Sequence, residues 1–589
     1  MKLPDAAASF IAGLRRRGAP GWLAALAVTA LAALPLFRPD WYRTSDADTF
    51  SAWYEAVRRT ILEYREFPFW NPWTHGGTPL FANPQVAVFG LETPLSLFFG
   101  AWMGWRIAAF CYLLLGAAGM YLLTGDWTKE PAARAGGAIL FAAGGAWPLH
   151  LAMGHPVFCG FLLLPYLIWL VRRADRDWRY AAGAGAVLGA IFDHALHYGA
   201  LIVTLTAAAA AIPVWWRNRR DPRFFGTVLW GLAGLCAAGG YRLTVTLDYL
   251  VHFPRATDQR LTVTLPALLK ALTVPFVPIG TGAFYSVEGE LWHWHELGCY
   301  VGVLALGFFL WSMRRGVRGW HLGAAAALLL MLDSASPWMP EYWLRRCWPF
   351  TGFLMITRWR FLLLFCVALG AAAGLGAVKL ERRWKWAVTA LSSLMLAANA
   401  WMIYGHEAMP RGTEAQVAAF FADLPPQPEI RTVNFGDASA YILTARNYAE
   451  ITAYEPQLGY VYDFRPARRP MDHPEYRGEC YTLAGDAMWR SRTPNRLAFT
   501  VTSPEAVIGV NQNPGSYWRD GAGNRVFPPA FREFEDELPF ELTAAAGDHE
   551  LVLRPPLHEA GLAVSLAGWL GLAAAIALDR RKRKTDNGC

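Results

Sequence analysis

The sequence predicts a polytopic α-helical membrane protein of about twelve spans, with an extracytoplasmic β-sandwich-like domain before the last span. Three observations support this prediction. Of the 589 residues, 54% are hydrophobic and only 17% are charged, whereas soluble proteins carry ~25% charged residues. Several windows of ~18–20 residues have almost no charge, which suits a hydrocarbon core of ~30 Å. The short, strongly basic segments between these windows all fall on one side of the membrane.

The first span follows a basic cluster at residues 15–17, and no small-residue cleavage site precedes Arg38, so we expect this span to be uncleaved. Twelve spans then place both termini in the cytoplasm of a bacterial cell, with the protein in the plasma (inner) membrane. The approximate spans are Gly21–Phe37, Trp105–Thr124, Ala135–His150, Val157–Val171, Tyr180–Ile191, Gly199–Trp215, Phe224–Gly240, Leu297–Met313, Trp320–Leu332, Phe361–Val378, Trp386–Tyr404 and Gly561–Leu578.

Three regions follow from these spans. Residues 1–404 form a membrane domain with two large outer loops, at 38–104 and 241–296. Residues 405–558 are long enough for a domain of their own, and their short alternating or β-branched runs between turn residues predict strands. Residues 559–589 hold the last span and a basic cytoplasmic tail.

Two carboxylates open the first outer loop, Asp46 and Asp48. A carboxylate just outside a span can act as a general base or hold a metal. Alternatively, Ser45 and Asp46 could cap a helix over about residues 49–64. One carboxylate can cap the helix while the other acts, so both interpretations stay open.

The same loop continues with FPFWNPWTHGGTPLFANPQ. Gly76 and Gly77 permit unusual backbone angles, and Trp70 could stack on a sugar face or lie at the lipid interface. An interfacial aromatic belt does not require Asn71 and His75 so close by. We therefore predict a substrate-binding loop at Trp70, Asn71, His75, Gly76 and Gly77.

Basic residues just outside a late span are not explained by the charge bias of cytoplasmic loops. Arg suits phosphate because of its planar, forked donor geometry, so Arg358 and Arg360 are candidates for binding a polyprenyl phosphate head group. Arg345 and Arg346 are interpreted instead as snorkelling side chains or partners of Glu341.

Several histidines have spacing that a divalent cation could use, although ordinary polar contacts are the commoner explanation. We predict no assured metal site and no obligatory cofactor. The candidate groups are Asp193 with His194 and His197, His293 and His295 with Glu296, and His150 with His155. The eight cysteines show no metal-ligand spacing, and Cys347 could pair with Cys480. Asn511, Gln512 and Asn513 could form either a sugar-contacting edge or a plain turn.

Taken in order, these motifs resemble the YfhO-type bacterial membrane proteins. The resemblance rests on the Ser45–Asp46 pair, the FPFWNPWTHGGTPLFANPQ loop, GHPVFCGFLLLPYLIW with FDHALHYGAL, ELGCYVG from Glu296, ITRWRFLLLFCVALGAAAGLG, and NQNPGSYW with GDHELVLRPP before the last span. These segments cover most of the chain. Their order is more specific than any one of them.

The resemblance implies a glycosyltransferase of the C superfamily (GT-C), with a catalytic Asp in the first outer loop and a polyprenyl-phosphate-linked sugar as donor. It also implies an envelope glycan, glycolipid or polymer such as teichoic acid as acceptor. The family's first-loop Asp falls on Asp46, and its late basic segment falls on Arg358 and Arg360, at a variant spacing. Asp48 is a second acidic group, and Glu296 opens the ELGCYVG segment of the substrate site.

Two other functional classes stay open. A lipid-linked glycan transporter or flippase usually carries polar residues at mid-span and broken helices in matching halves, and the sequence shows neither feature. A non-catalytic envelope assembly factor would have less need of Asp46. Nucleic acid is not an expected partner, because the net charge of +8 comes from basic residues scattered between the spans.

Overall fold

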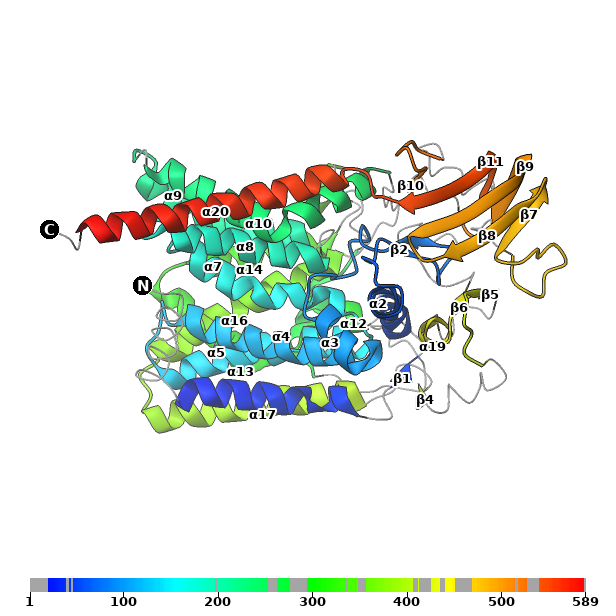
Figure 1. The fold of residues 1–589 in the computed structure, drawn as a ribbon. Helices are drawn as coiled ribbons and strands as arrows, with labels where there is room; N and C mark the ends of the chain where they lie inside the picture. Colours follow the sequence, from blue (N-terminus) through cyan, green and yellow to red (C-terminus); the bar gives the residue numbers. More distant parts are fainter. Residues whose placement is uncertain are drawn as a thin grey trace.

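The computed structural model describes most of the chain: residues 20–38, 42–43, 46–195, 199–221, 223–252, 262–275, 294–333, 336–344, 346–347, 356–405, 411–412, 425–434, 440–450, 469–513, 517–526 and 540–586. Long helices lie side by side in a bundle, and a β-rich part lies beyond one end of that bundle (Figure 1). We call this the outer end. The first helix begins, and the last one finishes, at the opposite end.

The bundle is built from the apolar segments of the sequence. Its elements are the first helix with η1 (Leu34–Phe37), α4 (Ala101–Thr124), α5 (Pro131–Ala143), α6 (Ala146–Ala152), η2 (Pro156–Leu163), α7 (Leu164–Val171), α8 (Trp178–Ala195), α9 (Gly199–Asn218), α10 (Arg223–His252), α13 (Val303–Ser312), η3 (Met313–Arg315), α14 (Gly319–Leu332), α16 (Arg360–Ala377), α17 (Arg382–Gly405) and α20 (His558–Asp586). Small residues let some of these helices approach closely. A Cβ added at Gly234 of α10 would lie 2.0 Å from the carbonyl oxygen of Ala182 on α8.

Seven helices in the described part of the chain are long and apolar enough to cross a membrane. They are Pro20–Phe37, Ala101–Thr124, Pro131–Ala152, Phe224–Leu250, Ile356–Ala377, Arg382–Gly405 and His558–Asp579. Two shorter apolar helices, Pro156–Val171 and Gly319–Leu332, lie among them. This pattern is that of a polytopic membrane protein, and the finer count of twelve crossings stays a prediction.

Each predicted span overlaps one or more helices, but some boundaries differ, and residues 298–302 of the span expected at Leu297–Met313 are not helical. The span expected at Tyr180–Ile191 belongs to the longer α8, and the one expected at Phe224–Gly240 continues as α10 to His252. The outer loop expected from residue 241 therefore begins later than predicted. Hydropathy falls along this last part of α10, which holds Arg242 and Asp248, so the apolar pattern ended before the helix did.

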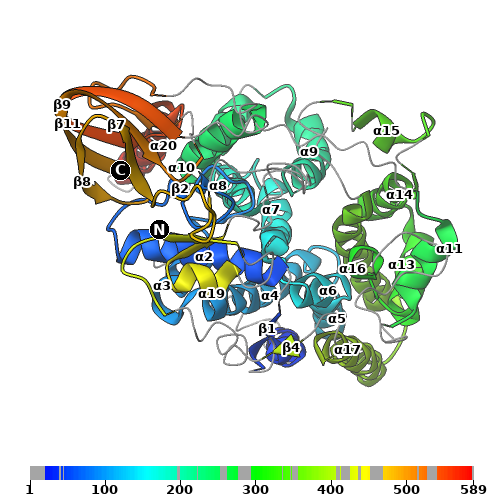
Figure 2. The same cartoon turned by 90° about the vertical axis from the view of Figure 1, so that its right-hand side faces the viewer.

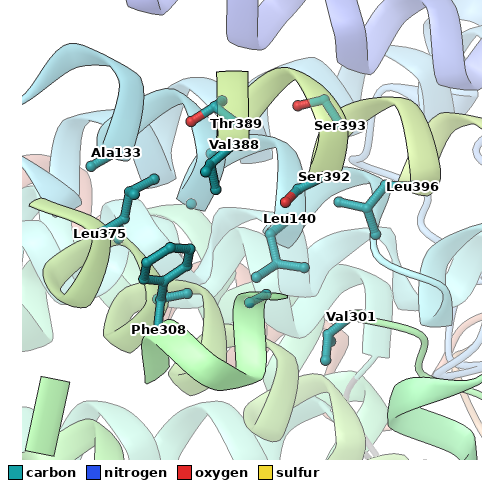
Figure 3. Close-up of a pocket in the computed structure, with 15 residues that line it drawn as sticks. Ala133, Leu140, Val301, Phe308, Leu375, Val388, Thr389, Ser392, Ser393 and Leu396 are labelled. Atoms are coloured by element: carbon teal, nitrogen blue, oxygen red, sulfur yellow. The ribbon is translucent and has the colours of Figure 1, made fainter. Parts of the chain in front are cut away.

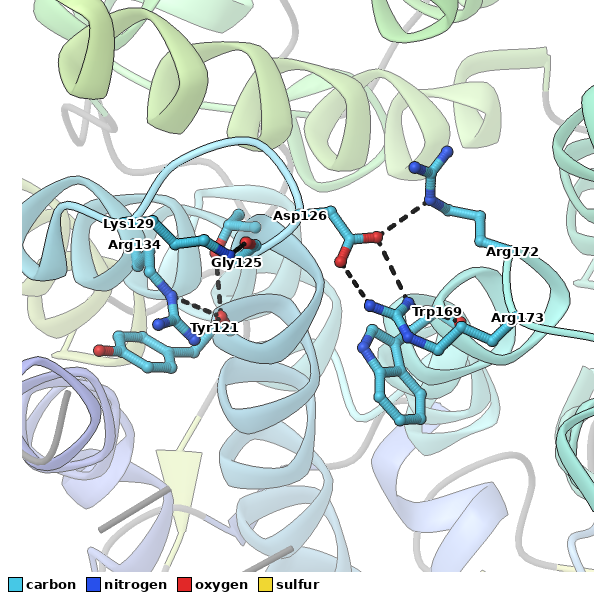
Figure 4. A network of polar contacts seen from close by, with 9 residues as sticks. Tyr121, Gly125, Asp126, Lys129, Arg134, Trp169, Arg172 and Arg173 are labelled. Carbon is cyan, nitrogen blue, oxygen red and sulfur yellow. Dashed lines mark hydrogen bonds and ion pairs between the residues drawn. The ribbon is translucent and has the colours of Figure 1, made fainter. Parts of the chain in front are cut away.

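Basic side chains gather at the end of the bundle opposite the β-rich part. Asp126, in the turn between α4 and α5, accepts hydrogen bonds from Arg172 Nε (3.1 Å) and Arg173 Nη2 (2.5 Å) at the end of α7 (Figure 4). In the same view Arg134 Nη2 donates to the carbonyl oxygen of Tyr121 at 2.9 Å. Basic residues of the predicted cytoplasmic loops thus meet around one partly buried carboxylate.

At the outer end, α2 (Asp46–Leu62) lies across the ends of the bundle helices, beside the short α19 (Ala440–Ala445) (Figure 2). Both faces of α2 are buried, with Phe50, Trp53 and Val57 among the core residues. The other short outer elements are β1 (Tyr42–Arg43), β2 (Trp70–Asn71), β3 (Thr78–Pro79), α3 (Glu92–Phe99), α11 (Leu265–Thr273), α12 (Trp294–Leu297), α15 (Pro340–Leu344), η5 (Ile356–Trp359), β4 (Arg411–Gly412), β5 (Arg431–Val433) and β6 (Tyr448–Glu450).

The main sheet is antiparallel and contains β7 (Cys480–Ala484), β8 (Ala487–Arg492), β9 (Arg496–Val510), β10 (Trp518–Arg519) and β11 (Phe540–Leu553). The strands β7 and β8 lie end to end along one edge of the long β9, since β7 pairs with residues 507–510 and β8 with residues 497–501. Next to it, β5 and β6 form a parallel pair. The described residues of this region thus form one larger sheet, and the sandwich-like packing of two sheets stays a prediction.

Candidate functional site

Asp46 is the first residue of α2, where the partial positive charge of the helix N-terminus favours a carboxylate. Its side chain is 42% exposed, and its Oδ2 is hydrogen-bonded to Nε2 of His155. Burial alone would raise the pKa of Asp46, but the interaction with His155 outweighs burial and holds the pKa below its usual value. The side chain is therefore a carboxylate at neutral pH, in contact with both solvent and a fixed donor.

A chain of hydrogen bonds runs inward from Asp46. His155 Nδ1 lies 2.8 Å from Nδ1 of His150, and His150 Nε2 is hydrogen-bonded to Arg360 Nη2. Arg360 also donates from Nη2 to the carbonyl oxygen of His295, at 2.5 Å. The chain joins four separate elements: the start of α2, the residue before η2, the end of α6 and the start of α16. We call Asp46, His150, His155 and Arg360 the site cluster.

The arginine sets the direction of every hydrogen bond in the site cluster. A guanidinium can only donate, so His150 accepts at Nε2 and carries its proton on Nδ1. His155 must then accept at Nδ1, which leaves its Nε2–H to donate to Asp46. The cluster thus fixes one tautomer for each histidine and presents a donor to Asp46.

A second charged pair lies beside the site cluster. Arg358 on η5 donates hydrogen bonds to the Glu296 carboxylate on α12, from Nη2 at 3.0 Å and from Nε at 3.5 Å. Burial would raise the pKa of Glu296, but Arg358 outweighs it and holds that pKa well below its usual value. Burial also lowers the pKa of His295 to about 3, so His295 is neutral. Arg358 keeps 11% of its side chain exposed, whereas Arg360 is 1% exposed.

The spacing of Arg358 and Arg360 explains their different partners. Trp359 lies between them, is 1% exposed, and donates from Nε1 to Glu341 Oε2 at 3.1 Å. Arg358 binds the Glu296 side chain on α12, whereas Arg360 binds His150 on α6 and the carbonyl oxygen of His295 on α12. Four of the residues predicted from sequence, Asp46, Glu296, Arg358 and Arg360, are thereby brought into one region.

Asp48 faces another direction. It is 1% exposed, and its Oδ1 accepts a hydrogen bond from the backbone N–H of Tyr441 at 3.3 Å. Tyr441 lies in the first turn of α19, where backbone N–H groups lack partners within their own helix. Asp48 therefore ties α2 to the start of α19, and its predicted catalytic role stays a prediction.

The aromatic and glycine-rich loop forms a buried junction with the C-terminal region. Trp70 and Asn71 are fully buried, and Asn71 Nδ2 donates to Thr74 Oγ1 at 2.7 Å. Asn513 Nδ2 donates to the carbonyl oxygens of His75 (2.8 Å) and Gly77 (2.9 Å). Gly76 and Gly77 both have positive φ, and a Cβ at Gly76 would lie 2.7 Å from Asn513 Oδ1. The predicted contact of this loop with a sugar stays a prediction.

The remaining candidate residues from the sequence either have other partners in the structure or lie outside the described residues. Asp193 and His194 bind Arg242 (3.3 Å) and Glu92 (3.2 Å), so they belong to buried ion pairs. Arg346 donates to the carbonyl oxygen of Tyr342. His197, His293 and Arg345 lie outside the described residues. Among the described residues, no group of three or more His, Cys, Asp or Glu side chains is placed to hold a metal ion.

Cys347 and Cys480 are both free thiols in the structure, so the suggested disulfide between them is wrong. Cys347 is exposed, whereas Cys480 begins a strand of the main sheet. The sequence placed both residues on the outer face but contained nothing about their separation. Asn511 binds the Arg469 backbone and Asn513 the glycine loop, so this run holds a junction in place.

Sequence reasoning missed the central role of His150 and His155. The sequence predicts an outward pair five residues apart, and in the structure His150 lies near the end of α6 and His155 directly before η2. Their partners are 109 and 210 residues away along the chain. Only the excess of histidines near the outer ends of predicted spans hinted at the cluster.

A small cavity in the bundle is a poor alternative site. It has a volume of about 30 Å³ and is lined mostly by apolar side chains of α5, α13, α16 and α17, with hydroxyls of Thr389, Ser392 and Ser393 (Figure 3). That volume is about the share of one water molecule in the liquid. A sugar or a phosphate does not fit there.

No protein-family model matches the chain, and no curated protein sequence matches it. The resemblance to the YfhO-type family therefore stays a prediction. Among solved structures, the crystal structure of ArnT from Cupriavidus metallidurans bound to undecaprenyl phosphate is similar in fold. The TM-score is 0.41 at 12% sequence identity, over 74% of this chain and 86% of that chain. At this level the likeness does not assign an activity or a ligand.

Proposed function

We propose that the chain is a membrane glycosyltransferase of the GT-C type. It would transfer a sugar from a polyprenyl-phosphate donor to a glycan, glycolipid or polymer acceptor at the outer end of the bundle. The observation that carries the proposal is Asp46: a half-exposed carboxylate, held ionised by His155, at the end of a bundle of membrane-type helices. The order of motifs in the sequence supports the same reaction class.

The proposed step is a single displacement. An acceptor hydroxyl oxygen attacks the anomeric carbon, a new C–O bond forms, and the bond from that carbon to the phosphate oxygen breaks. The hydroxyl proton passes to Asp46, and polyprenyl phosphate leaves with the bonding electron pair. The anomeric configuration is inverted. His155 occupies Oδ2, so Oδ1 is the oxygen proposed to take the proton.

The two arginines have different proposed roles. Arg358 is the more exposed and would stabilise the phosphate as negative charge builds on it. Glu296 holds the fork of Arg358 in place before substrate arrives. Arg360 is buried and would act only through His150, by fixing the tautomers that present a donor to Asp46. The basic end of the bundle supports an orientation with both termini in the cytoplasm.

The test is transfer of labelled sugar from synthetic polyprenyl-phosphate donors by the purified full chain in detergent. Asp46→Asn should lower turnover by about 10²–10⁴-fold, the usual contribution of a general base. Asp48→Asn is the matched control: it lies on the same helix, and the Asn side chain still offers an oxygen to Tyr441. Full turnover in Asp46→Asn would overturn the proposal. Saturable binding of polyprenyl phosphate with no turnover in the wild type would favour a flippase or an assembly factor.

A further inference from the structure

A polar cavity lies near the far end of α2 from Asp46. Its volume is about 400 Å³, within the range of small-molecule sites (~300–1,000 Å³). The lining comes from the segment after α2, from the start of β5, and from β7 and β8. The residues are Tyr64, Pro428, Glu429, Ile430, Arg431, Gly478, Glu479, Cys480, Trp489, Arg490, Ser491 and Arg492. None of them belongs to the site cluster.

One guanidinium in this cavity is held rigidly. Arg492 is 12% exposed, and its Nη1 donates to Glu479 Oε2 at 3.2 Å. Glu479 is itself fixed, because it accepts hydrogen bonds from Thr432 N (2.7 Å) and Tyr476 OH (3.1 Å). Arg492 Nη2 makes no hydrogen bond to any described residue. A pre-oriented guanidinium with donor capacity left over suits an anionic oxygen.

The edge strand is shaped to bring four consecutive side chains to the cavity. In a regular strand, neighbouring side chains point to opposite faces, but the pairing of β8 with β9 shifts between Trp489 and Ser491. Such bulges re-aim side chains and are common beside functional sites. Residues 489–492 all line the cavity as a result. The bulge therefore keeps Trp489, Arg490 and Arg492 together among the residues that line the cavity.

The composition of the wall indicates the class of ligand. Trp489 packs on Phe499 at 5.3 Å between ring centroids and is only partly buried, so part of the indole is available to a sugar face. Arg490 is 42% exposed and its Nη1 lies 3.4 Å from Oδ2 of the exposed Asp548, and Arg431 is also exposed. Three arginines face two glutamates in the lining, and Glu479 already has several partners. The wall thus favours a ring that carries negative charge.

We propose that this cavity binds an acidic saccharide unit of the acceptor, one that carries a carboxylate or a phosphate. The 17 residues of α2 span about 25 Å at ~1.5 Å per residue, and this length separates the cavity from Asp46. An acceptor held at both places is therefore a chain rather than a single sugar. The assignment to the acceptor rests on the proposed function, whereas the binding of an acidic saccharide does not.

The test is calorimetric titration of the full chain in detergent with hexagalacturonate, and with maltohexaose as a neutral oligomer of the same number of units. We expect saturable binding of hexagalacturonate at least tenfold tighter than that of maltohexaose. Arg492→Gln and Arg490→Gln should each weaken it about tenfold. Arg490 is an exposed position, so that variant stays informative if Arg492→Gln folds poorly. Arg496→Gln, on the same sheet but outside the cavity, should bind as the wild type does.

Equal binding of the two oligomers, no saturable binding, or unchanged affinity in Arg490→Gln would overturn the inference. Asp46→Asn should bind hexagalacturonate with unchanged affinity. If that variant also kept full transferase activity, the proposed function would fail while the saccharide site stood. If binding were absent and Asp46→Asn still abolished transfer, the site would fail while the proposed function stood.

Discussion

Two clusters of charged residues lie beside the first outer loop, and they differ in their contact with solvent. The site cluster ends at Asp46, which is 42% exposed. The other cluster, which we call the anchor cluster, contains Glu92, Asp193, His194 and Arg242. All of its side chains are at most 5% exposed.

The anchor cluster is closed because every charge in it faces the protein. Arg242 contacts Asp193 and also donates from Nη2 to the carbonyl oxygens of Asn83 (2.6 Å) and Val86 (2.7 Å). Asp193 in turn accepts from the backbone N–H of Phe89. The helices α8 and α10 thereby hold the end of the first outer loop. The anchor cluster thus joins elements within the protein, whereas the site cluster presents a carboxylate to solvent.

The largest effect on stability is expected at the anchor cluster. Arg242→Leu leaves the buried Asp193 carboxylate without its cation, a change that typically costs about 3–5 kcal/mol. The measurement is the thermal unfolding midpoint in detergent, beside Arg383→Gln, an exposed ion-pair variant (with Glu381) expected to stay within ~0.5 kcal/mol. Asp46→Asn should resemble the control in unfolding, despite its large effect on turnover. An Arg242→Leu protein as stable as the wild type would show that the anchor cluster does not contribute to the stability of the fold.

The next effect is a shift in pH dependence at the site cluster. His155→Leu removes the donor that lowers the pKa of Asp46, so that pKa should rise. The acid limb of the profile of kcat/KM against pH should then move to higher pH. His155→Gln retains an N–H donor and should shift the limb less. The stability that the lowered pKa contributes is present above about pH 4 and is lost as pH falls through the folded-state pKa. If the acid limb of kcat/KM lay at the same pH in the wild type, His155→Leu and His155→Gln, then His155 would have no influence on the protonation of Asp46 during catalysis.

The smallest effect is expected at Asp48. Asp48→Ala removes the acceptor for the Tyr441 N–H at the start of α19, and loss of such a contact usually costs about 1 kcal/mol. Thermal unfolding should show this small loss, while transferase turnover in folded protein should be unchanged. A loss of turnover as large as that of Asp46→Asn would mean that both carboxylates act in the reaction.

The sequence was informative where a local pattern carries the information. Apolar windows and basic loops predicted where helices lie, and Asp46 stood out because two carboxylates follow an apolar span directly. The hydrogen bond from Arg360 to His150 joins residues 210 positions apart. No periodicity or spacing in a single sequence encodes such a pair. The metal interpretation of Asp193 and His194 left out Glu92 and Arg242 for the same reason.

The glycine-rich loop is a second case in which the sequence does not identify the contact partner. Its composition suggested a ligand pocket, since glycine lets a backbone approach another group closely. The group that approaches is Asn513 of the same chain. This approach concerns Gly76, whereas the group against Gly77 is Trp70 of the same loop, and both glycines have positive φ. Sequence alone predicts the unusual backbone but does not say what lies against it.

Asn513 clamps the glycine-rich loop through two hydrogen bonds, and these can form only after Asn513 has been synthesised. Its partners His75 and Gly77 are 438 and 436 residues earlier in the chain. At roughly 5–20 residues per second, the first outer loop waits about 20–90 s for Asn513 to be made. During that interval the carbonyl oxygens of His75 and Gly77 lack the hydrogen bonds from Asn513. A ribosome that stalls before residue 513 therefore leaves an inserted bundle whose first loop lacks this clamp.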